Sequence, residues 1–174
     1  MNDLKRYIRN IPDFPKKGIV FRDITTLIGN KEIFKKTINL FFERYKDKKI
    51  DAVACVESRG FIFGAAVCYK LGASFVPVRK KGKLPYKTLS ATYELEYGTD
   101  TLEIHQDAIA PGAKVLIMDD LLATGGTISA VAELVKKLSG EIIEAAFVIE
   151  LEFLKGREKI KGVPVFSLVK YESE

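Results

Sequence analysis

The sequence predicts a single α/β domain of 174 residues, with a central, mostly parallel sheet flanked by helices. Short, continuously apolar runs such as residues 115–118 are typical of parallel strands that are covered on both faces. Stretches with helical periodicity alternate with these runs, which is the pattern of a parallel sheet wrapped by helices. Residues 80–109 depart from the alternation, and they predict a protruding, flexible hairpin lid.

Residues 1–29 are expected to form a cap over the sheet. The part from residue 11 to residue 29 carries two prolines and two glycines, which favour loops. Asn30 then provides an N-cap for an amphipathic helix over residues 31–45. The next expected elements are a strand over 52–56, a helix from about 61 to 71 that ends at Gly72, and a strand over 75–78.

The hairpin segment begins with charged residues, Gly82 and Pro85. Two arms with alternating residues follow, over 88–97 and 101–105, and they indicate a lid rather than core. After Gly112 the parallel pattern returns. The expected elements there are a strand over 114–118, a helix over 127–138, a strand over 142–151, a helical turn near Lys155 and a strand over 165–169.

Composition excludes several classes of protein. The 47% hydrophobic and 29% charged content is ordinary for a globular domain, and no apolar run is long enough to span a membrane. With no signal peptide and only Cys55 and Cys68, neither a disulfide framework nor a zinc site is expected, and the location is predicted to be cytoplasmic. The net charge of +5 permits nucleic-acid binding, but it comes without a long basic run, and a small polyanionic substrate explains it equally well.

The most informative stretch is residues 115–127, VLIMDDLLATGGT. Asp119 and Asp120 follow the apolar run, at the carboxyl end of a strand, where open α/β sheets place ligands. Gly125 and Gly126 let backbone amides approach an anion at the start of the next helix. Since carboxylates suit hydroxyls or magnesium while amides suit phosphate, the stretch fits a ribose 5-phosphate.

This stretch resembles the binding motif of the type I phosphoribosyltransferases, and the form DDLLATGGT resembles the adenine branch of that family. The similarity continues in FPKKGIVFRDI at residues 14–24, ESRGF at 57–61, RKKGKLP at 79–85 and LEYG at 95–98. It runs from about residue 11 to the end of the chain. The resemblance implies purine salvage: transfer of the 5-phosphoribosyl group from phosphoribosyl pyrophosphate to N9 of adenine, giving AMP and pyrophosphate.

The same resemblance assigns residues to the sugar phosphate. The 5-phosphate is expected at Ala123, Thr124, Gly125, Gly126 and Thr127. Asp119 and Asp120 are expected to bind the ribose hydroxyls and to orient Mg²⁺. The metal is expected to arrive with the substrate, because no dedicated protein cage is visible and magnesium keeps water and phosphate ligands.

The same resemblance also assigns residues to the binding of pyrophosphate and of adenine. Ser58, Arg59, Arg79, Lys80 and Lys83 are expected to bind pyrophosphate, with Arg79 a candidate to act across a dimer interface. Phe21 is expected to stack on the purine, although ordinary core packing also explains this residue. Leu121 is expected to close the other side of the ring. The backbone of Val20 and Arg22 offers an acceptor and a donor whose polarity selects adenine over oxopurines.

Two further expectations concern catalysis and assembly. Glu96 is the candidate that manages the N9 proton or stabilises the cationic ring, together with Arg59 as a catalytic residue, although a solvated carboxylate also explains Glu96. Tyr97 belongs to the lid, which closes to exclude water. A homodimer is the family expectation, with no nucleic acid or membrane partner.

Two other functions stay open at this point. One is transfer to another base, namely hypoxanthine or guanine, xanthine, or orotate. The other is a non-catalytic regulator that senses phosphoribosyl pyrophosphate. A phosphate-loop NTPase and a dinucleotide oxidoreductase are excluded, because neither GxxxxGK[ST] nor GxGxxG occurs in the chain.

Overall fold

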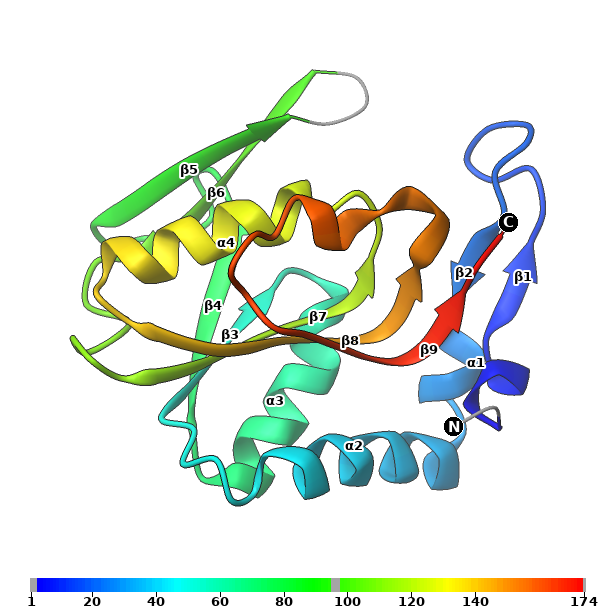
Figure 1. Ribbon diagram of the computed structural model, residues 1–174, viewed down its shortest axis with the longest axis horizontal. Coiled ribbons are helices and arrows are strands. Elements are labelled where there is room, and N and C mark those ends of the chain that lie inside the picture. The colour runs from blue at the N-terminus through cyan, green and yellow to red at the C-terminus, as the bar shows by residue number, and fades with distance from the viewer. Residues whose placement is uncertain (1–2, 95–97, 174) are drawn as a thin grey trace.

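The computed structural model describes residues 3–94 and 98–173. Within these residues, seven strands form one sheet in the order β5-β6-β4-β3-β7-β8-β9, and Figure 1 shows its twist. The predicted α/β class is confirmed, because β4, β3, β7, β8 and β9 are parallel and only the pairs β4–β6 and β5–β6 are antiparallel. The strands are β3 (Ala52–Val56), β4 (Ser74–Lys80), β5 (Thr88–Glu94), β6 (Thr99–His105), β7 (Lys114–Leu122), β8 (Glu141–Leu151) and β9 (Val165–Tyr171).

Helices cover both faces of this sheet. Helices α2 (Lys31–Tyr45) and α3 (Arg59–Leu71) pack on one face, and α4 (Gly126–Lys137) packs on the other (Figure 1). All five residues of β3 are buried between these layers, as expected for a parallel strand. The predicted Asn30 cap is confirmed, since its side chain accepts hydrogen bonds from the backbone of Glu32 and Ile33. Gly72 ends α3 with a left-handed φ of 67°.

The N-terminal cap contains more regular structure than the sequence predicted. Strands β1 (Arg9–Ile11) and β2 (Phe21–Asp23) form an antiparallel pair, between the short helices η1 (Leu4–Tyr7) and α1 (Thr25–Ile28). Each strand has three residues, too few for an alternating pattern to be visible in the sequence. The cap is joined to the core through the buried side chains of Leu4, Ile8, Ile24 and Leu27.

The two arms of the predicted hairpin are confirmed within the described residues as β5 and β6, whereas residues 95–97 of the predicted first arm lie outside them. The prediction that the hairpin lies outside the core is wrong for its inner face. Strand β6 pairs with β4 at Arg79↔Glu103 and Lys80↔Leu102, so the hairpin extends the main sheet. Ala91, Leu102 and Ile104 are buried in the same cluster as α4. The distal part projects beyond α4 in Figure 1. Alternation places one apolar face of each arm against the helix, which the sequence pattern alone did not reveal.

Strand β7 is longer than predicted. It continues to pair with β8 as far as Leu122↔Glu150, so Asp119 and Asp120 lie within the strand and not after it. Its pairing with β3 stops earlier, at Cys55↔Met118. The two acids therefore lie beyond the end of one neighbouring strand while the other still supports them. The helical turn predicted near Lys155 consists of η2 (Glu152–Leu154) and η3 (Gly156–Glu158).

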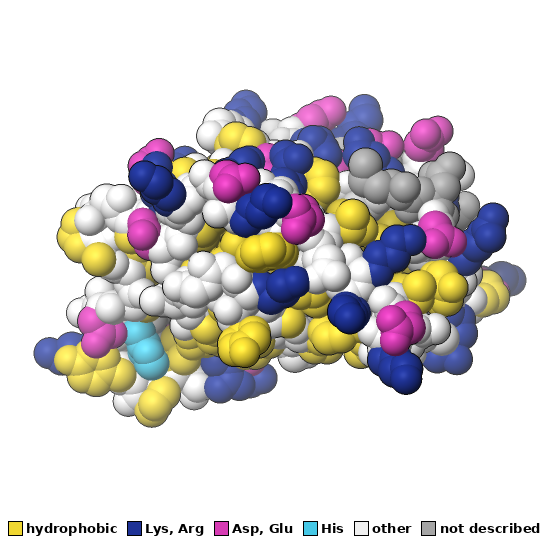
Figure 2. All heavy atoms as spheres, turned by 90° about the horizontal axis from the view of Figure 1, so that it is seen from below, with side chains coloured by type: hydrophobic (Ala, Val, Ile, Leu, Met, Phe, Trp, Pro, Cys, Tyr) yellow, Lys and Arg dark blue, Asp and Glu magenta, His cyan; other side chains and the backbone are white. Residues whose placement is uncertain are grey.

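The surface carries both signs of charge. On the face seen in Figure 2, Lys and Arg side chains alternate with Asp and Glu, and hydrophobic groups lie between them. Across residues 3–94 and 98–173, no helix combines the length and apolarity needed to cross a bilayer.

Candidate active site

The carboxyl ends of β3, β4 and β7 meet at one edge of the sheet. The loop after β3 leads directly into α3, whose first residue is Arg59. Because β7 runs on beyond its last pair with β3, its two acids face the start of α3. Arg59 Nε lies 3.0 Å from Asp120 Oδ2. The ESRG and DDLLATGGT motifs, far apart in the sequence, are thus neighbours.

A cavity of about 190 Å³ lies at this edge. Nearly all of the residues assigned to the sugar phosphate line it, together with Arg59. The lining is Arg59, Asp119, Asp120, Leu121, Leu122, Ala123, Thr124, Gly125, Thr127 and Ile128. The cavity is therefore bounded by two carboxylates on one side and by a loop at a helix N-terminus on the other.

We call residues 123–127 the phosphate loop. Gly125 has a φ of +82°, which glycine adopts without steric cost. A Cβ at Gly125 would lie 2.2 Å from the carbonyl oxygen of Gly156, so this position also requires glycine because of a backbone contact. A Cβ at Gly126 would meet Glu94 O at 3.1 Å and Tyr93 at 3.3 Å. The hairpin therefore lies directly over the first residue of α4.

The two acids differ in their surroundings. Asp120 is only 3% exposed, whereas Asp119 is partly exposed and accepts a hydrogen bond of 2.8 Å from the backbone N–H of Asp120. Burial raises the pKa of both carboxyls, and the neighbouring charge of Asp120 raises the pKa of Asp119 further. Although Arg59 is close, Asp120 Oδ2 has no partner of hydrogen-bond geometry among the described residues. This buried oxygen is suited to a hydroxyl donor or a cation.

Three of the cations predicted for pyrophosphate, Arg79, Lys80 and Lys83, form an adjoining cluster and do not line the cavity, whereas Arg59 does. Glu57 accepts from Arg79 Nε at 2.8 Å, and its other oxygen lies 3.3 Å from Lys83 Nζ. Lys80 Nζ is paired with Asp100 at 3.0 Å. Burial opposes ionisation of Glu57, but hydrogen bonds from the Lys80 backbone and from Arg79 and Lys83 keep its pKa below the ordinary value. Ser58 is exposed and precedes α3.

The residues predicted for adenine lie beside the cavity, and only Leu121 lines it. The ring of Phe21 is 5.3 Å from Arg59 Cζ and makes an edge-on contact with Phe14. Val20 is half-buried. The role predicted for Arg22 belongs to its backbone; its side chain donates to Asn10 Oδ1 and stacks on the Tyr171 ring. Arg59 therefore links the candidate base region to the acidic edge.

Three comparisons with known proteins agree. The family model described as "Phosphoribosyl transferase domain" matches residues 24–169. The adenine phosphoribosyltransferase of Syntrophotalea carbinolica is 61% identical over 171 residues, which are 98% of this chain and 100% of the relative. The chain belongs to the adenine phosphoribosyltransferase family.

Solved adenine phosphoribosyltransferases have the same fold. The crystal structure from Thermoanaerobacter pseudethanolicus superimposes with a TM-score of 0.94 at 52% identity, covering 98% of this chain and 99% of that one. The yeast enzyme, complexed with adenine and an imino-altritol bisphosphate, gives a TM-score of 0.91 at 46% identity. The coverage is 96% of this chain and 97% of the yeast chain.

Some residues of this adenine phosphoribosyltransferase site were missed by sequence reasoning, and two predicted ones cannot be placed. Glu96 and Tyr97 fall outside the described residues. Glu57 was missed, although it precedes the predicted Ser58. Tyr93 lies against Gly126 in the phosphate loop, 3.3 Å from where a Cβ would be, and no sequence pattern marks that contact. In the described part of the chain, no group of three or more His, Cys, Asp or Glu side chains is arranged for a metal ion.

Proposed function

We propose that the cavity is the site at which the 5-phosphoribosyl group passes from phosphoribosyl pyrophosphate to N9 of adenine, with AMP and pyrophosphate as products. The supporting observation is the meeting of Arg59, the acids Asp119 and Asp120, and the phosphate loop around one cavity. No single one of these groups specifies the substrate. Together they offer a cation, two hydroxyl acceptors and an anion cradle, which is the set that a phosphorylated ribose with a pyrophosphate leaving group requires.

The phosphate loop binds the 5-phosphate in this proposal. Backbone N–H groups at the start of α4 have no partners within the helix, and the helix dipole adds positive potential there. Thr124 and Thr127 line the cavity and supply hydroxyl donors, alongside Ala123 and Gly125. Gly126 completes the loop beneath the hairpin. The phosphate therefore fixes one end of the sugar.

Asp119 and Asp120 hold the ribose hydroxyls. A hydroxyl donated to Asp120 Oδ2 satisfies the buried oxygen that is without a hydrogen-bond partner in the described residues. The same pair fits Mg²⁺ carried by the substrate, because two carboxylates suffice for an ion that keeps water and phosphate ligands. Bound there, magnesium would neutralise charge on the pyrophosphate. Ionised carboxylates are required for both roles, and burial makes ionisation costly until a ligand arrives.

The pyrophosphate leaves toward Ser58, Arg59, Arg79, Lys80 and Lys83. As the bond to C1 breaks, negative charge accumulates on pyrophosphate and the ring gains oxocarbenium character, so fixed cations lower the barrier. Arg59 is the catalytic residue among them, because it already borders the cavity. Arg79 and Lys83 are held by Glu57, and Lys80 by Asp100, within reach of the same sheet edge.

Adenine is placed between Phe21 and Leu121. The backbone of Val20 and Arg22 supplies one acceptor for the exocyclic amine and one donor for a ring nitrogen. Hypoxanthine and guanine present the opposite polarity, and each mismatched buried group costs about 1–3 kcal/mol. Glu96 manages the N9 proton in this proposal, and Tyr97 belongs to the lid that excludes water.

We also propose a homodimer in the cytoplasm. Ile62, Tyr69 and Phe75 are exposed apolar side chains on α3 and β4, and Tyr69 is 89% exposed. Such residues are candidates for burial between two copies. Both cysteines are free, which fits a reducing compartment. Sedimentation of the purified protein tests the assembly, and cell fractionation tests the location.

The decisive assay supplies phosphoribosyl pyrophosphate, Mg²⁺ and one base at a time, and measures nucleotide formation. Among the bases tested, only adenine is expected to give rapid turnover. Turnover with guanine, hypoxanthine, xanthine or orotate but not adenine contradicts the base assignment. Tight nucleic-acid binding without turnover favours a regulator.

A second set of measurements tests the residues. Asp120→Asn and Gly126→Val are expected to weaken sugar-phosphate binding, whereas Glu96→Gln mainly lowers kcat. Unchanged kinetics in all three variants contradict this arrangement of the site.

A further inference from the structure

We propose that Glu150 and Arg157 are positioning residues for the phosphate loop, and that they act through the backbone of Gly156. We call these three residues the buttress. The inference rests on the proposed function, because it takes the phosphate loop to be the site of the 5-phosphate. It adds residues that neither touch substrate nor belong to any motif of the sequence.

The buttress touches the phosphate loop through two glycines. A Cβ at Gly125 would lie 2.2 Å from Gly156 O, and a Cβ at Gly156 would lie 2.2 Å from Ala123 O. Both distances are impossible for real side chains, so the two backbones are in direct contact. Gly156 is buried and is the first residue of η3. A shift of η3 therefore moves the amides that the phosphate loop presents to a ligand.

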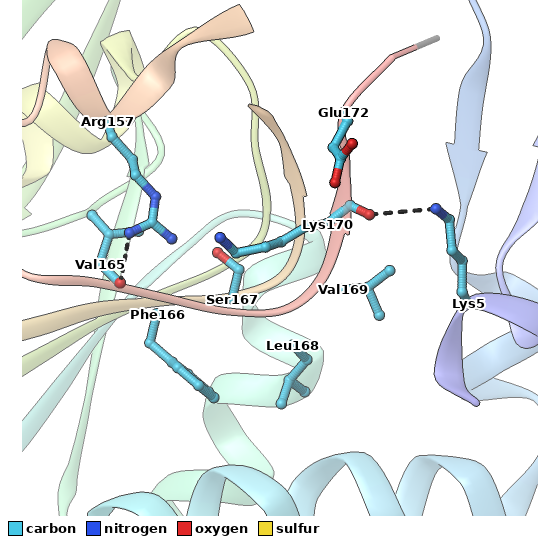
Figure 3. A pocket seen from close by; sticks show the side chains of 9 residues that line it. All are labelled: Lys5, Arg157, Val165, Phe166, Ser167, Leu168, Val169, Lys170 and Glu172. Carbon is cyan, nitrogen blue, oxygen red and sulfur yellow. Dashed lines mark hydrogen bonds between the residues drawn. The ribbon is translucent and has the colours of Figure 1, made fainter. Parts of the chain in front are cut away.

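Arg157 fixes the position of η3. Its Nε and Nη2 donate to the two carboxylate oxygens of Glu150 at 2.5 and 2.7 Å, which is a bidentate pair. Its Nη1 donates to Val165 O at 3.1 Å. Figure 3 shows Arg157 descending from η3 to β9, with Ser167 on the same strand. Ser167 Oγ donates to Glu150 Oε2 at 2.6 Å, so the acceptor is itself held in place.

The burial of Glu150 makes this anchor rigid. Its side chain is only 3% exposed, whereas that of Arg157 is 42% exposed. A buried carboxylate without its partner is costly, so Glu150 constrains where the guanidinium lies. Gly156 immediately precedes Arg157 in the chain, and it offers no side chain of its own to fix the contact. The ion pair therefore determines how closely the turn approaches the phosphate loop.

Strand β8, which contains Glu150, also contains a glutamate with a matched network of hydrogen bonds that does not reach the phosphate loop. Glu144 is also buried, accepts a bidentate pair from Arg44 at 2.7 and 2.7 Å, and accepts a hydroxyl bond from Tyr45 at 2.6 Å. The Arg44 side chain is 35% exposed, close to the value for Arg157. This second network ties α2 to β8. It provides a control with the same chemistry and a similar cost in stability.

The test compares Arg157→Met with Arg44→Met in the full-length protein. Both leave a buried glutamate without its guanidinium, so similar decreases in Tm are expected. Arg157→Met is expected to raise the Kd for ribose 5-phosphate and the KM for phosphoribosyl pyrophosphate about 10-fold, because small displacements of a positioning group are amplified. Arg44→Met is expected to leave both values within about 2-fold. Equal effects of the two variants, or no effect of Arg157→Met, overturn the proposal.

Milder variants cover the case in which Arg157→Met does not fold. Ser167→Ala removes one hydrogen bond to Glu150 and is expected to raise the ribose 5-phosphate Kd about 3-fold, within the range for a single hydrogen bond. An unchanged Kd in Ser167→Ala then overturns the proposal. Thr124→Ala, in the phosphate loop itself, distinguishes failure of the loop's proposed function from failure of the buttress proposal. If it leaves the Kd unchanged, the proposed function of the loop fails; if it raises the Kd while the buttress variants do not, only the buttress fails.

Discussion

Arg59 Nε lies 3.0 Å from Asp120 Oδ2, so a cation at the start of α3 and an acid within β7 form an ion pair across the candidate active site. The acid is buried, whereas the Arg59 side chain is 38% exposed. The guanidinium can therefore turn toward a ligand while the carboxylate stays in place. This pair joins the two sequence motifs that carry most of the chemistry.

Replacing Arg59 is expected to impair catalysis more than binding of the base. Arg59→Gln should lower kcat/KM for phosphoribosyl pyrophosphate about 100- to 1000-fold, since one preorganised donor at a developing charge is worth that much. Arg59→Lys should recover only part of the loss, because lysine lacks the planar fork. Steady-state kinetics check both variants. Lys36→Gln, in an exposed ion pair with Asp3, is the control, and parental kinetics in Arg59→Gln contradict the assignment.

Asp120→Asn is expected to stabilise the ligand-free protein while it weakens binding. The folded-state pKa of Asp120 is raised above 3.8, chiefly by burial, so the folded state binds more protons than the unfolded state. Its contribution to stability is therefore full below the unfolded pKa and is lost as pH rises through the folded pKa. The gain from Asn should grow as pH rises above about 4, with Tm rising about 2–4 °C for each kcal/mol.

Chemical denaturation across this pH range measures the effect. Asp107→Asn, which removes an exposed acid, is the control. A larger stability difference at low pH than at high pH would contradict the sign argued here.

Glu57→Gln is expected to give the opposite pH dependence. Hydrogen bonds from the Lys80 backbone, Arg79 and Lys83 outweigh burial and lower the pKa of Glu57. Its stabilising contribution is therefore present above the unfolded pKa and is lost as pH falls through the folded pKa. At neutral pH the variant should lose about 1–2 kcal/mol, and the loss should shrink below about pH 4. Thermal unfolding at several pH values checks this, with the exposed Glu43→Gln as control.

Gly60→Ala is expected to displace an acid of the site. A Cβ at Gly60 would lie 2.9 Å from Asp119 Oδ1, and the nearby strand backbone leaves no room for both. The expected result is a fall in kcat/KM of about 10- to 100-fold, because misplaced positioning groups lose their effect. Gly140→Ala is a matched control, since its Cβ would be equally crowded, 2.9 Å from Val135, but far from any site residue. Comparable kinetic losses in both variants would show that crowding alone is responsible.

Much of the fold could be predicted because local patterns specify it. The Asn30 cap, the apolar run of β3 and Gly72 at the end of α3 each act within a few residues, and each was found where expected. The wrong predictions fall where local patterns do not specify the structure. Strands β1 and β2 are too short to show a period, and β7 extends past its predicted end because β8 continues to supply hydrogen bonds. Those hydrogen bonds come from β8, and the local sequence of β7 does not show that β8 is its neighbour.

By itself, the sequence determined which chemical groups occur together in each motif: adjacent acids, a glycine turn and a helix start, all fixed by spacing along one stretch of chain. Only the tertiary structure decided which motifs meet. The pairing of Glu57 with Arg79, the cover of Gly126 by Tyr93 and the contact of Gly125 with Gly156 each join separate elements. Strand order and register set these contacts, and both are settled by the packing of the whole sheet.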